Sequence, residues 1–192
     1  MPDEPLKDWK FLLNTALLAL VLTLQLAGAF KGINETVNSA IPLIEASWTR
    51  FLTALGSDYF FLPLLALLVF FDWRKNGPSR KTLAFLIAAF MGLGIVAAMK
   101  VILAEPRPRP LPGSDFLSSG AFPSGHTFRA AIIATYVSDR WGKLAPLAWA
   151  YAIGIGLTRL LLHYHWLSDV LFSLLLAPWL YSVAKAAVGV RG

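Results

Sequence analysis

The sequence predicts an all-α bundle of six transmembrane helices. Of its 192 residues, 57% are hydrophobic and 15% are charged, whereas an ordinary soluble domain carries about 25% charged residues. A soluble globule of this size leaves close to a third of its unfolded surface exposed, so it could not bury this much apolar surface. Six apolar runs of roughly 20 residues, the length that crosses a bilayer as a helix, use about 120 residues. Residues 1–192 are therefore predicted to form one membrane domain.

The first three spans are predicted from apolar runs that charges bound. Residues 9–30 form the first span. A cleaved signal peptide is the alternative, but the apolar run is too long and acidic residues precede it. Residues 31–58 are less apolar, and their hydrophobic residues at helical spacing predict a segment along the membrane interface. The second span, about 55–71, is short unless it begins inside that segment. A charged turn then precedes the third span, residues 83–103.

Prolines separate the third span from the fourth. Prolines at positions 106, 108, 110, 112 and 123 exclude a helix over residues 104–123. A fourth helix is predicted over 124–141. A fifth covers 144–162, with Pro146 tolerated in its first turn. The sixth covers 166–188, and Pro178 is expected to bend it.

The distribution of basic residues predicts the orientation. With both termini in the cytoplasm, ten of the 17 Lys and Arg residues fall on the cytoplasmic side: Lys7, Lys10, Arg74, Lys75, Arg80, Lys81, Arg140, Lys143, Lys185 and Arg191. Cytoplasmic loops are normally enriched in such residues. The net charge of +6 is thus explained without nucleic acid. The absence of cysteine excludes disulfides, zinc–thiolate sites and a cysteine nucleophile.

Four polar segments fall at the outer edge of the membrane in this topology. They contain Lys100, Arg107, the helix start at Ser124, and the stretch from Arg159 to Asp169. Ionisable residues at membrane depth are costly and generally functional. Four such segments at one depth predict a functional site on the extracytoplasmic face.

These segments resemble the type 2 phosphatidic acid phosphatase family, also called PAP2 or lipid phosphate phosphatases. The family pattern is Lys, six residues, Arg-Pro; then Pro-Ser-Gly-His; then Ser-Arg, five residues, His, three residues, Asp. The corresponding residues are Lys100 with Arg107-Pro108, Pro123-Ser124-Gly125-His126, and Thr158-Arg159 with His165 and Asp169. Thr158 replaces the serine of the family. The stretch from Leu52 to Ser57 is similar to a weaker family feature.

The residue types are suited to phosphate chemistry independently of the resemblance. Asp169 follows His165 by four residues and shares its face on a helix, where a carboxylate fixes the tautomer and leaves the other ring nitrogen as a nucleophile. Cationic side chains at Lys100, Arg107 and Arg159 suit phosphate oxygens. Each residue alone has an ordinary structural explanation, such as an interfacial histidine or a snorkelling cation. Their convergence favours phosphate.

The start of the fourth helix adds two further features. Ser124 and Gly125 lie where unpaired backbone N–H groups and the helix dipole attract an anion. His126 follows one step further and is suited to protonate a leaving oxygen. The resemblance implies a phosphohistidine on His165, an acid role for His126, and phosphate binding by the remaining motif residues: Lys100, Arg107, Ser124, Gly125 and Arg159.

Two residues leave alternatives open. His163, His165 and Asp169 have metal-ligand types, but three neighbouring cations would repel a divalent ion, so no metal and no cofactor are expected. Arg129 lies three residues after His126 on the same helix face and deeper in the membrane. It either pairs with Glu105, Asp58 or a helix-end carbonyl, or contacts a second phosphate or lipid headgroup as a substrate-binding residue.

The resemblance implies metal-independent hydrolysis of a phosphate monoester or pyrophosphate on a membrane lipid, such as phosphatidic acid, phosphatidylglycerol phosphate or a polyprenyl pyrophosphate. Short loops also favour a lipid over a large soluble substrate. One alternative is a phosphotransferase that passes the same intermediate to a lipid acceptor. A non-enzymatic transporter is disfavoured because the polar groups cluster at one depth. Oligomeric state is not predicted.

Overall fold

Helices form every regular element of the described chain. A computed structural model describes residues 6, 8–111 and 120–190. The elements in these ranges are α1 (Trp9–Leu26), α2 (Lys31–Ala40), α3 (Ser47–Ala54), α4 (Asp58–Asn76), α5 (Arg80–Leu103), α6 (Gly125–Arg140), the short 3₁₀ helix η1 (Gly142–Leu144), α7 (Ala145–Leu161) and α8 (Leu167–Ala187). The predicted all-α class is confirmed.

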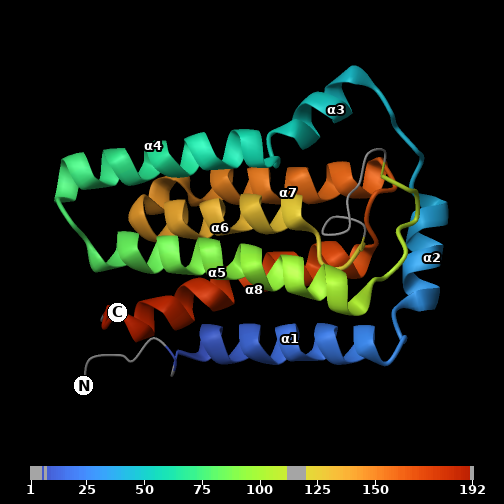
Figure 1. Ribbon diagram of the computed structural model, residues 1–192, viewed down its shortest axis with the longest axis horizontal. Coiled ribbons are helices and arrows are strands. Elements are labelled where there is room, and N and C mark those ends of the chain that lie inside the picture. The colour runs from blue at the N-terminus through green and yellow to red at the C-terminus, as the bar shows by residue number, and fades with distance from the viewer. Residues whose placement is uncertain (1–5, 7, 112–119, 191–192) are drawn as a thin grey trace.

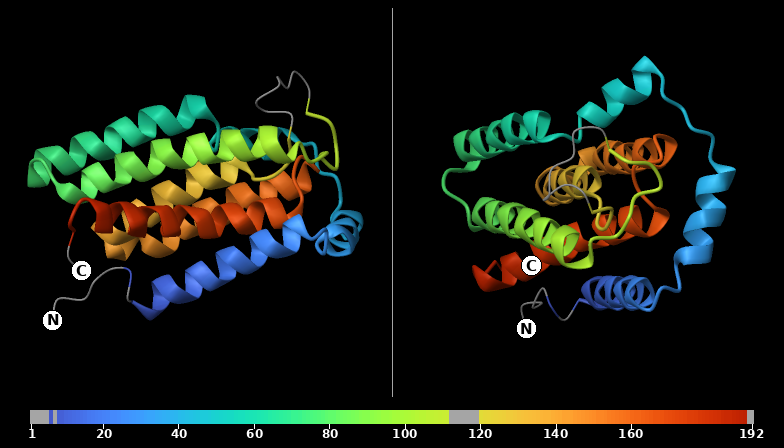
Figure 2. Two further views of the ribbon diagram at one scale, coloured as in Figure 1. Left: turned by 60° about the horizontal axis from the view of Figure 1, so that its bottom comes forward. Right: turned by 45° about the vertical axis from the view of Figure 1, so that its right-hand side comes forward.

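Six helices of the described chain have 16 residues or more: α1, α4, α5, α6, α7 and α8. They run side by side with alternating direction, and α6 lies among the others (Figures 1 and 2). Helix α6 packs against α5, α7 and α8, while α1 packs against α8. The alanines of α6 at positions 130, 131 and 134 are fully buried. Small residues let helix backbones approach closely where lipid surrounds the bundle, which explains how a central helix can have so many neighbours.

Four helices of the described residues are candidate membrane spans by length and composition, or five if a bent pair counts as one span. Residues 9–26, 80–103, 142–161 and 167–187 are long and apolar enough to cross a bilayer, and α3 with α4 forms a further pair bent by 45°. The sixth predicted span is not confirmed. Helix α6 has 16 residues, several of them charged, and is shorter than the roughly 20 residues that cross the hydrocarbon core.

The segment predicted to lie along the interface consists of two short helices, α2 and α3. Helix α2 crosses the end of the bundle outside the long helices (Figure 2). It is attached by Asn34, whose Nδ2 donates to Ser168 Oγ at 2.9 Å, while the N–H of Ser168 donates back to Asn34 Oδ1 at 3.2 Å. These bonds anchor α2 to the start of α8.

Local capping accounts for two helix boundaries that differ from the sequence prediction. Helix α4 continues to Asn76, beyond the predicted residue 71, because Arg74 and Lys75 favour a helix C-terminus and Gly77 ends it at φ 69°. Helix α5 starts at Arg80 instead of residue 83 because Ser79 Oγ caps it by accepting from the Thr82 N–H. Helix α8 continues through Pro178 to Ala187.

A buried carboxylate connects α4, α5 and α6 near the end where α1 begins and α8 finishes. Asp72 is fully buried and accepts hydrogen bonds from Tyr136 Oη at 2.9 Å and Arg140 Nε at 2.8 Å. Thr82 Oγ1 and Asn76 Nδ2 also donate to it. A buried charge needs such partners to offset the loss of hydration.

Candidate active site

Three segments distant in the sequence meet at the end of the bundle where α5 and α7 finish and α6 and α8 begin (Figure 1). They are the end of α5 with the following loop, the start of α6, and the α7–α8 junction. The described loop residues are fastened at two points. The N–H of Ala121 donates to Glu105 O at 2.8 Å, and Trp166 Nε1 donates to Pro106 O at 2.8 Å.

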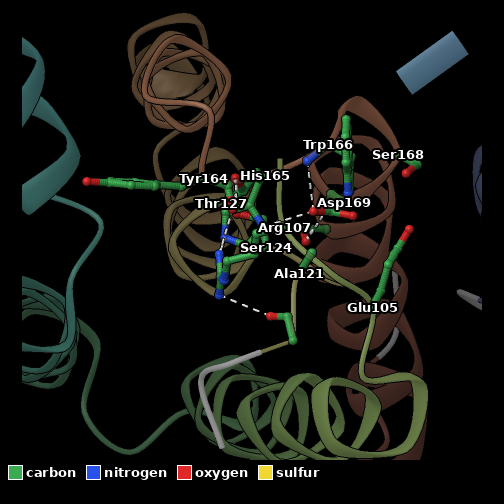
Figure 3. Close-up of polar contacts among 12 residues, drawn as sticks. Glu105, Arg107, Ala121, Ser124, Thr127, Tyr164, His165, Trp166, Ser168 and Asp169 are labelled. Carbon is green, nitrogen blue, oxygen red and sulfur yellow. Dashed lines mark hydrogen bonds and ion pairs between the residues drawn. The ribbon is translucent and has the colours of Figure 1, made fainter. Parts of the chain in front are cut away.

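His165 and Asp169 form the centre of the cluster (Figure 3). Asp169 Oδ2 lies 2.9 Å from His165 Nδ1 and also accepts the N–H of Trp166 at 2.9 Å. On the other side of the ring, Arg107 Nη1 lies 3.0 Å from His165 Nε2. A guanidinium can only donate, and a carboxylate accepts. The neutral ring therefore carries its proton on Nδ1 and has its lone pair on Nε2.

The surroundings favour the neutral form of His165. The side chain is 2% exposed. Burial, followed by the charges of Arg159, Lys100 and Arg107, holds the pKa of His165 well below its ordinary value. A neutral imidazole with an unprotonated Nε2 is the form that can attack an electrophile.

Lys100 and Arg107 converge on one backbone carbonyl. Lys100 Nζ donates to Gly120 O at 2.6 Å and to Ala121 O at 3.2 Å, and Arg107 Nη2 donates to Gly120 O at 3.0 Å. A Cβ on residue 120 would lie 2.4 Å from Lys100 O, so only glycine allows this close approach. Gly120 thus holds two cations of the site beside each other.

Arg159 is buried, with 3% of its surface exposed. Its Nη1 donates to Thr53 Oγ1 at 2.7 Å, and its guanidinium lies 4.9 Å from the centre of the Tyr164 ring. Thr53 belongs to α3, so the short helix before α4 contributes directly to orienting a cation of the cluster. The tyrosine face compensates part of the buried charge.

The start of α6 faces the same region. Ser124 is fully buried, and its N–H donates to Asp169 O at 3.2 Å, which ties the two helix starts together. Thr127 Oγ1 donates to Ser124 Oγ at 2.9 Å. Gly125 opens the helix, whose first-turn N–H groups have no helical acceptors and attract anions.

His126 belongs to this cluster through its electrostatic interactions and its packing. It interacts with Arg159, Arg129, Arg107 and Lys100, and its charge acts on His165. The break between α3 and α4 packs against it: a Cβ on Gly56 would lie 3.1 Å from His126 Cβ and 2.8 Å from Ile155 Cγ2. Gly56 therefore leaves the space that His126 occupies.

The two residues with open alternatives have specific partners. Arg129 forms an ion pair with Asp58, one of the three partners considered from the sequence. Glu105 instead accepts from Gln25 Nε2 at 2.8 Å, and burial raises its pKa. His163 Nε2 lies 3.0 Å from Ile41 O. His163 thus contacts the α2–α3 connection, while His165 and Asp169 contact each other.

The structure brings together all of the predicted cluster: Lys100, Arg107, Ser124, Gly125, His126, Arg159, His165 and Asp169. Sequence reasoning missed Thr53, Gly56, Gly120 and Tyr164 as residues that shape it. Two of them, Thr53 and Gly56, fall in the Leu52 to Ser57 stretch, whose weaker likeness to the family was a usable signal. Gly120 and Tyr164 carry no such signal in the sequence. Gly120 acts through its carbonyl oxygen and Tyr164 through a ring beside a guanidinium, and both contacts depend on tertiary packing.

A family model covers the region of the chain that contains this site. Residues 81–189, more than half of the chain and all of the motif residues, match the model of the PAP2 superfamily. The chain belongs to the PAP2 superfamily. The family assignment from the three motifs is therefore confirmed.

Known members of this superfamily resemble the chain in sequence and in structure. The crystal structure of a transmembrane PAP2-type phosphatidylglycerolphosphate phosphatase from Bacillus subtilis has a TM-score of 0.71 at 26% identity, covering 90% of this chain and 94% of that one. The lipid A 1-phosphatase of Porphyromonas gingivalis is 26% identical over 73% of this chain and 36% of its own length. The undecaprenyl-diphosphatase of Sulfolobus acidocaldarius is 25% identical over 68% of this chain and 64% of its own. The chain thus spans less than two thirds of either curated relative.

Proposed function

We propose that the chain is an integral-membrane lipid phosphatase that hydrolyses a lipid phosphate monoester or a polyprenyl pyrophosphate through a phosphohistidine on His165, without a metal. The observation that carries this proposal is the state of the His165 ring. Its Nδ1 is held by Asp169 at 2.9 Å and its Nε2 faces the cations of the site. A phosphate drawn to those cations comes within reach of a nucleophilic nitrogen.

In the first step, Nε2 of His165 attacks the phosphorus, and the bond from phosphorus to the lipid oxygen breaks. His126 gives its proton to the departing oxygen. Lys100, Arg107 and Arg159, together with the hydroxyl of Ser124 and the N–H of Gly125, stabilise the charge on the phosphoryl oxygens. Such fixed donors act strongly because the site is largely buried. Arg107 exchanges its contact with Nε2 for the phosphate.

In the second step, water attacks the phosphorus of the phosphohistidine. His126, now neutral, accepts a proton from the water, the bond from phosphorus to Nε2 breaks, and inorganic phosphate leaves. Asp169 keeps the proton on Nδ1 and stabilises the positive charge that the ring carries as an intermediate. The fixed cations around His165 attract a phosphate dianion and repel a divalent metal ion, which supports a metal-independent reaction.

We further propose that six helices cross the membrane, with both termini in the cytoplasm and the site at the extracytoplasmic face of a cell membrane. The asymmetric distribution of Lys and Arg supports this orientation. Helix α1 begins and α8 finishes at the end opposite the site (Figure 1). Helix α6 completes the count as a short span among α5, α7 and α8. That residues 1–192 form one domain stays a prediction.

The test is phosphate release from a panel of lipid monophosphates and diphosphates in detergent with a chelator present. The native chain should release phosphate, and His165→Ala should lose activity by at least about 10⁴-fold because the nucleophile is gone. His163→Asn is the matched control, since asparagine tolerates the φ of 53° at this position. Activity in His165→Ala equal to that of the control would contradict the proposal. Labelled water distinguishes hydrolysis, which puts the label in free phosphate, from transfer to a lipid acceptor.

The role of His126 is tested with leaving groups of different acidity. His126→Gln should lose about 10²–10⁴-fold on an alkyl phosphate, where the departing oxygen needs a proton. It should lose much less in the first step on a nitrophenyl phosphate, because a nitrophenolate departs without protonation. Equal losses in the burst phase on both substrates would show that His126 is not the acid.

A further inference from the structure

Arg129 is a cation that the proposed reaction does not use. It lies on α6, three residues after His126, and its side chain is 14% exposed. Its Nη2 forms an ion pair with Asp58, and its buried Nε has no hydrogen-bond partner among the residues that the structure describes. A charged side chain inside a membrane protein is costly, so the presence of Arg129 calls for a physical reason.

The guanidinium of Arg129 reaches the phosphate-binding end of α6. A Cβ on Gly125 would lie 3.4 Å from Arg129 Nη1 and 4.0 Å from its Cζ. The charge of Arg129 acts on Lys100, His126 and Arg159. Arg129 therefore belongs to the same electrostatic cluster as the residues that face the substrate phosphate.

The described partner of Arg129 is a carboxylate. Lys100 and Arg107 donate to backbone carbonyls, and Arg159 donates to a hydroxyl. Arg129 is paired with the carboxylate of Asp58, whose side chain is 59% exposed. A carboxylate offers the same pair of oxygen acceptors that a phosphate offers to a guanidinium. Because Asp58 reaches solvent at the first residue of α4, an incoming anion can replace it.

We propose that Arg129 is a specificity-determining residue that binds the second, lipid-side phosphate of a diphosphate lipid, and that Asp58 occupies it when no substrate is bound. This inference rests on the proposed function and names a substrate class for it. A diphosphate carries more negative charge than a monophosphate. Arg129 supplies the additional positive charge once Asp58 withdraws.

The direction of α6 fits this arrangement. The helix runs inward from Ser124, so Arg129 lies about 4.5 Å deeper along the axis than His126. His165 attacks the terminal phosphorus, and the bond from that phosphorus to the bridging oxygen breaks. The departing group is the lipid monophosphate, which takes up the proton of His126. This group leaves on the His126 side, where Arg129 offsets its charge.

The experiment compares farnesyl diphosphate with farnesyl monophosphate, which share one chain and differ by one phosphate. Arg129→Gln should lower kcat/KM for the diphosphate by roughly 10–100-fold, as expected for a lost charged hydrogen bond, and for the monophosphate by less than about 3-fold. Arg129→Lys should retain part of the preference for the diphosphate, because lysine keeps the positive charge but lacks the paired N–H donors of the guanidinium. Asp58→Asn should raise kcat/KM for the diphosphate more than for the monophosphate, since an anion that competes for Arg129 is removed.

The ratio of the two kcat/KM values is measured on one preparation, so it does not depend on how much of a variant folds. Arg50→Gln, an exposed arginine of α3 paired with Glu45, is the control for general loss of positive charge and should keep the native ratio. An Arg129→Gln enzyme with equal losses on both substrates would overturn the inference while leaving the proposed function intact. A native chain that hydrolyses neither substrate, nor any other lipid phosphate, would overturn both.

Discussion

His165 Nδ1, just before α8, lies 2.9 Å from Oδ2 of Asp169 in the first turn of that helix. This contact fixes which ring nitrogen carries the proton, and Arg107 at 3.0 Å from Nε2 is consistent with the same tautomer. The nucleophile is thus oriented from both sides before a substrate arrives.

Asp169→Asn is expected to lower kcat by at least about 10²-fold. The amide keeps the size of the side chain but lacks the charge that stabilises the imidazolium of the intermediate, and it no longer enforces the tautomer. The measurement is kcat on a saturating lipid phosphate. Asp139→Asn removes a carboxylate at the far end of α6, where it pairs with Lys81 and Lys185, and should leave kcat per folded enzyme unchanged.

The pH dependence of kcat/KM should be bell-shaped. Protonation of Nε2 removes the lone pair of His165, so activity falls as the pH drops through the pKa of His165. Burial and neighbouring cations lower that pKa, so the acid limb should lie below the ordinary value of about 6.5. The alkaline limb should follow loss of the proton from His126. A profile without a fall on either side in the histidine range would contradict this pair of roles.

The pH dependence of kcat/KM in Asp169→Asn distinguishes an electrostatic role of Asp169 from a purely structural one. Removing the negative charge next to His165 destabilises the protonated ring further, so the acid limb of Asp169→Asn should move to lower pH. If Asp169→Asn loses activity but its acid limb stays at the native pH, the role of Asp169 is only structural, at the start of α8.

Gly56→Ala is expected to reduce kcat by roughly 10–100-fold. The added Cβ would lie 2.8 Å from Ile155 Cγ2 and 3.1 Å from His126 Cβ, so His126 must shift, and a displacement of about 1 Å can cost 10²-fold in rate. Gly94→Ala is the matched control because nothing lies within 4 Å of its added Cβ. That control should gain about 0.5–1 kcal/mol in helix stability with its activity unchanged.

Thr53→Ala should raise KM or lower kcat/KM by about 10-fold, the effect of losing a hydrogen bond to a charged group. Arg159 Nη1 donates to Thr53 Oγ1 at 2.7 Å, so the alanine variant leaves the guanidinium less well oriented toward phosphate. Thr53→Ser retains the hydroxyl and should recover near-native kinetics. Failure of serine to recover them would mean that the methyl group, and not the hydrogen bond, is what matters.

Asp72→Asn should destabilise the bundle by about 3–5 kcal/mol without altering kcat of the folded protein. The substitution leaves the Arg140 charge, whose side chain is 16% exposed, without its carboxylate. Thermal unfolding in detergent measures the loss. The double variant Asp72→Asn with Arg140→Gln removes both charges and should recover part of the stability, and a further loss in the double variant would contradict the explanation.

The amino-acid sequence was enough to predict the all-α class, the apolar helices and the superfamily of this protein. Apolar runs predict helices wherever a bilayer is the solvent, because backbone groups in lipid must be satisfied within each segment. His165 and Asp169 make the contact expected from their spacing, but not on one helix face: His165 precedes α8, and Asp169 reaches back across the helix start while it accepts the N–H of Trp166. The motif residues show the family. The orientation in the membrane, which is inferred from the unequal distribution of Lys and Arg, stays a prediction.

Only the tertiary structure decided which side chain takes which partner. Arg129 had three candidate partners in the sequence and has Asp58 in the fold. Gly120 and Thr53 receive hydrogen bonds from cations far away in the chain, and Gly56 touches His126 across a helix break. The periodicity of hydrophobic residues along the sequence does not encode such contacts, because they depend on how α3, α5, α6 and α7 pack together.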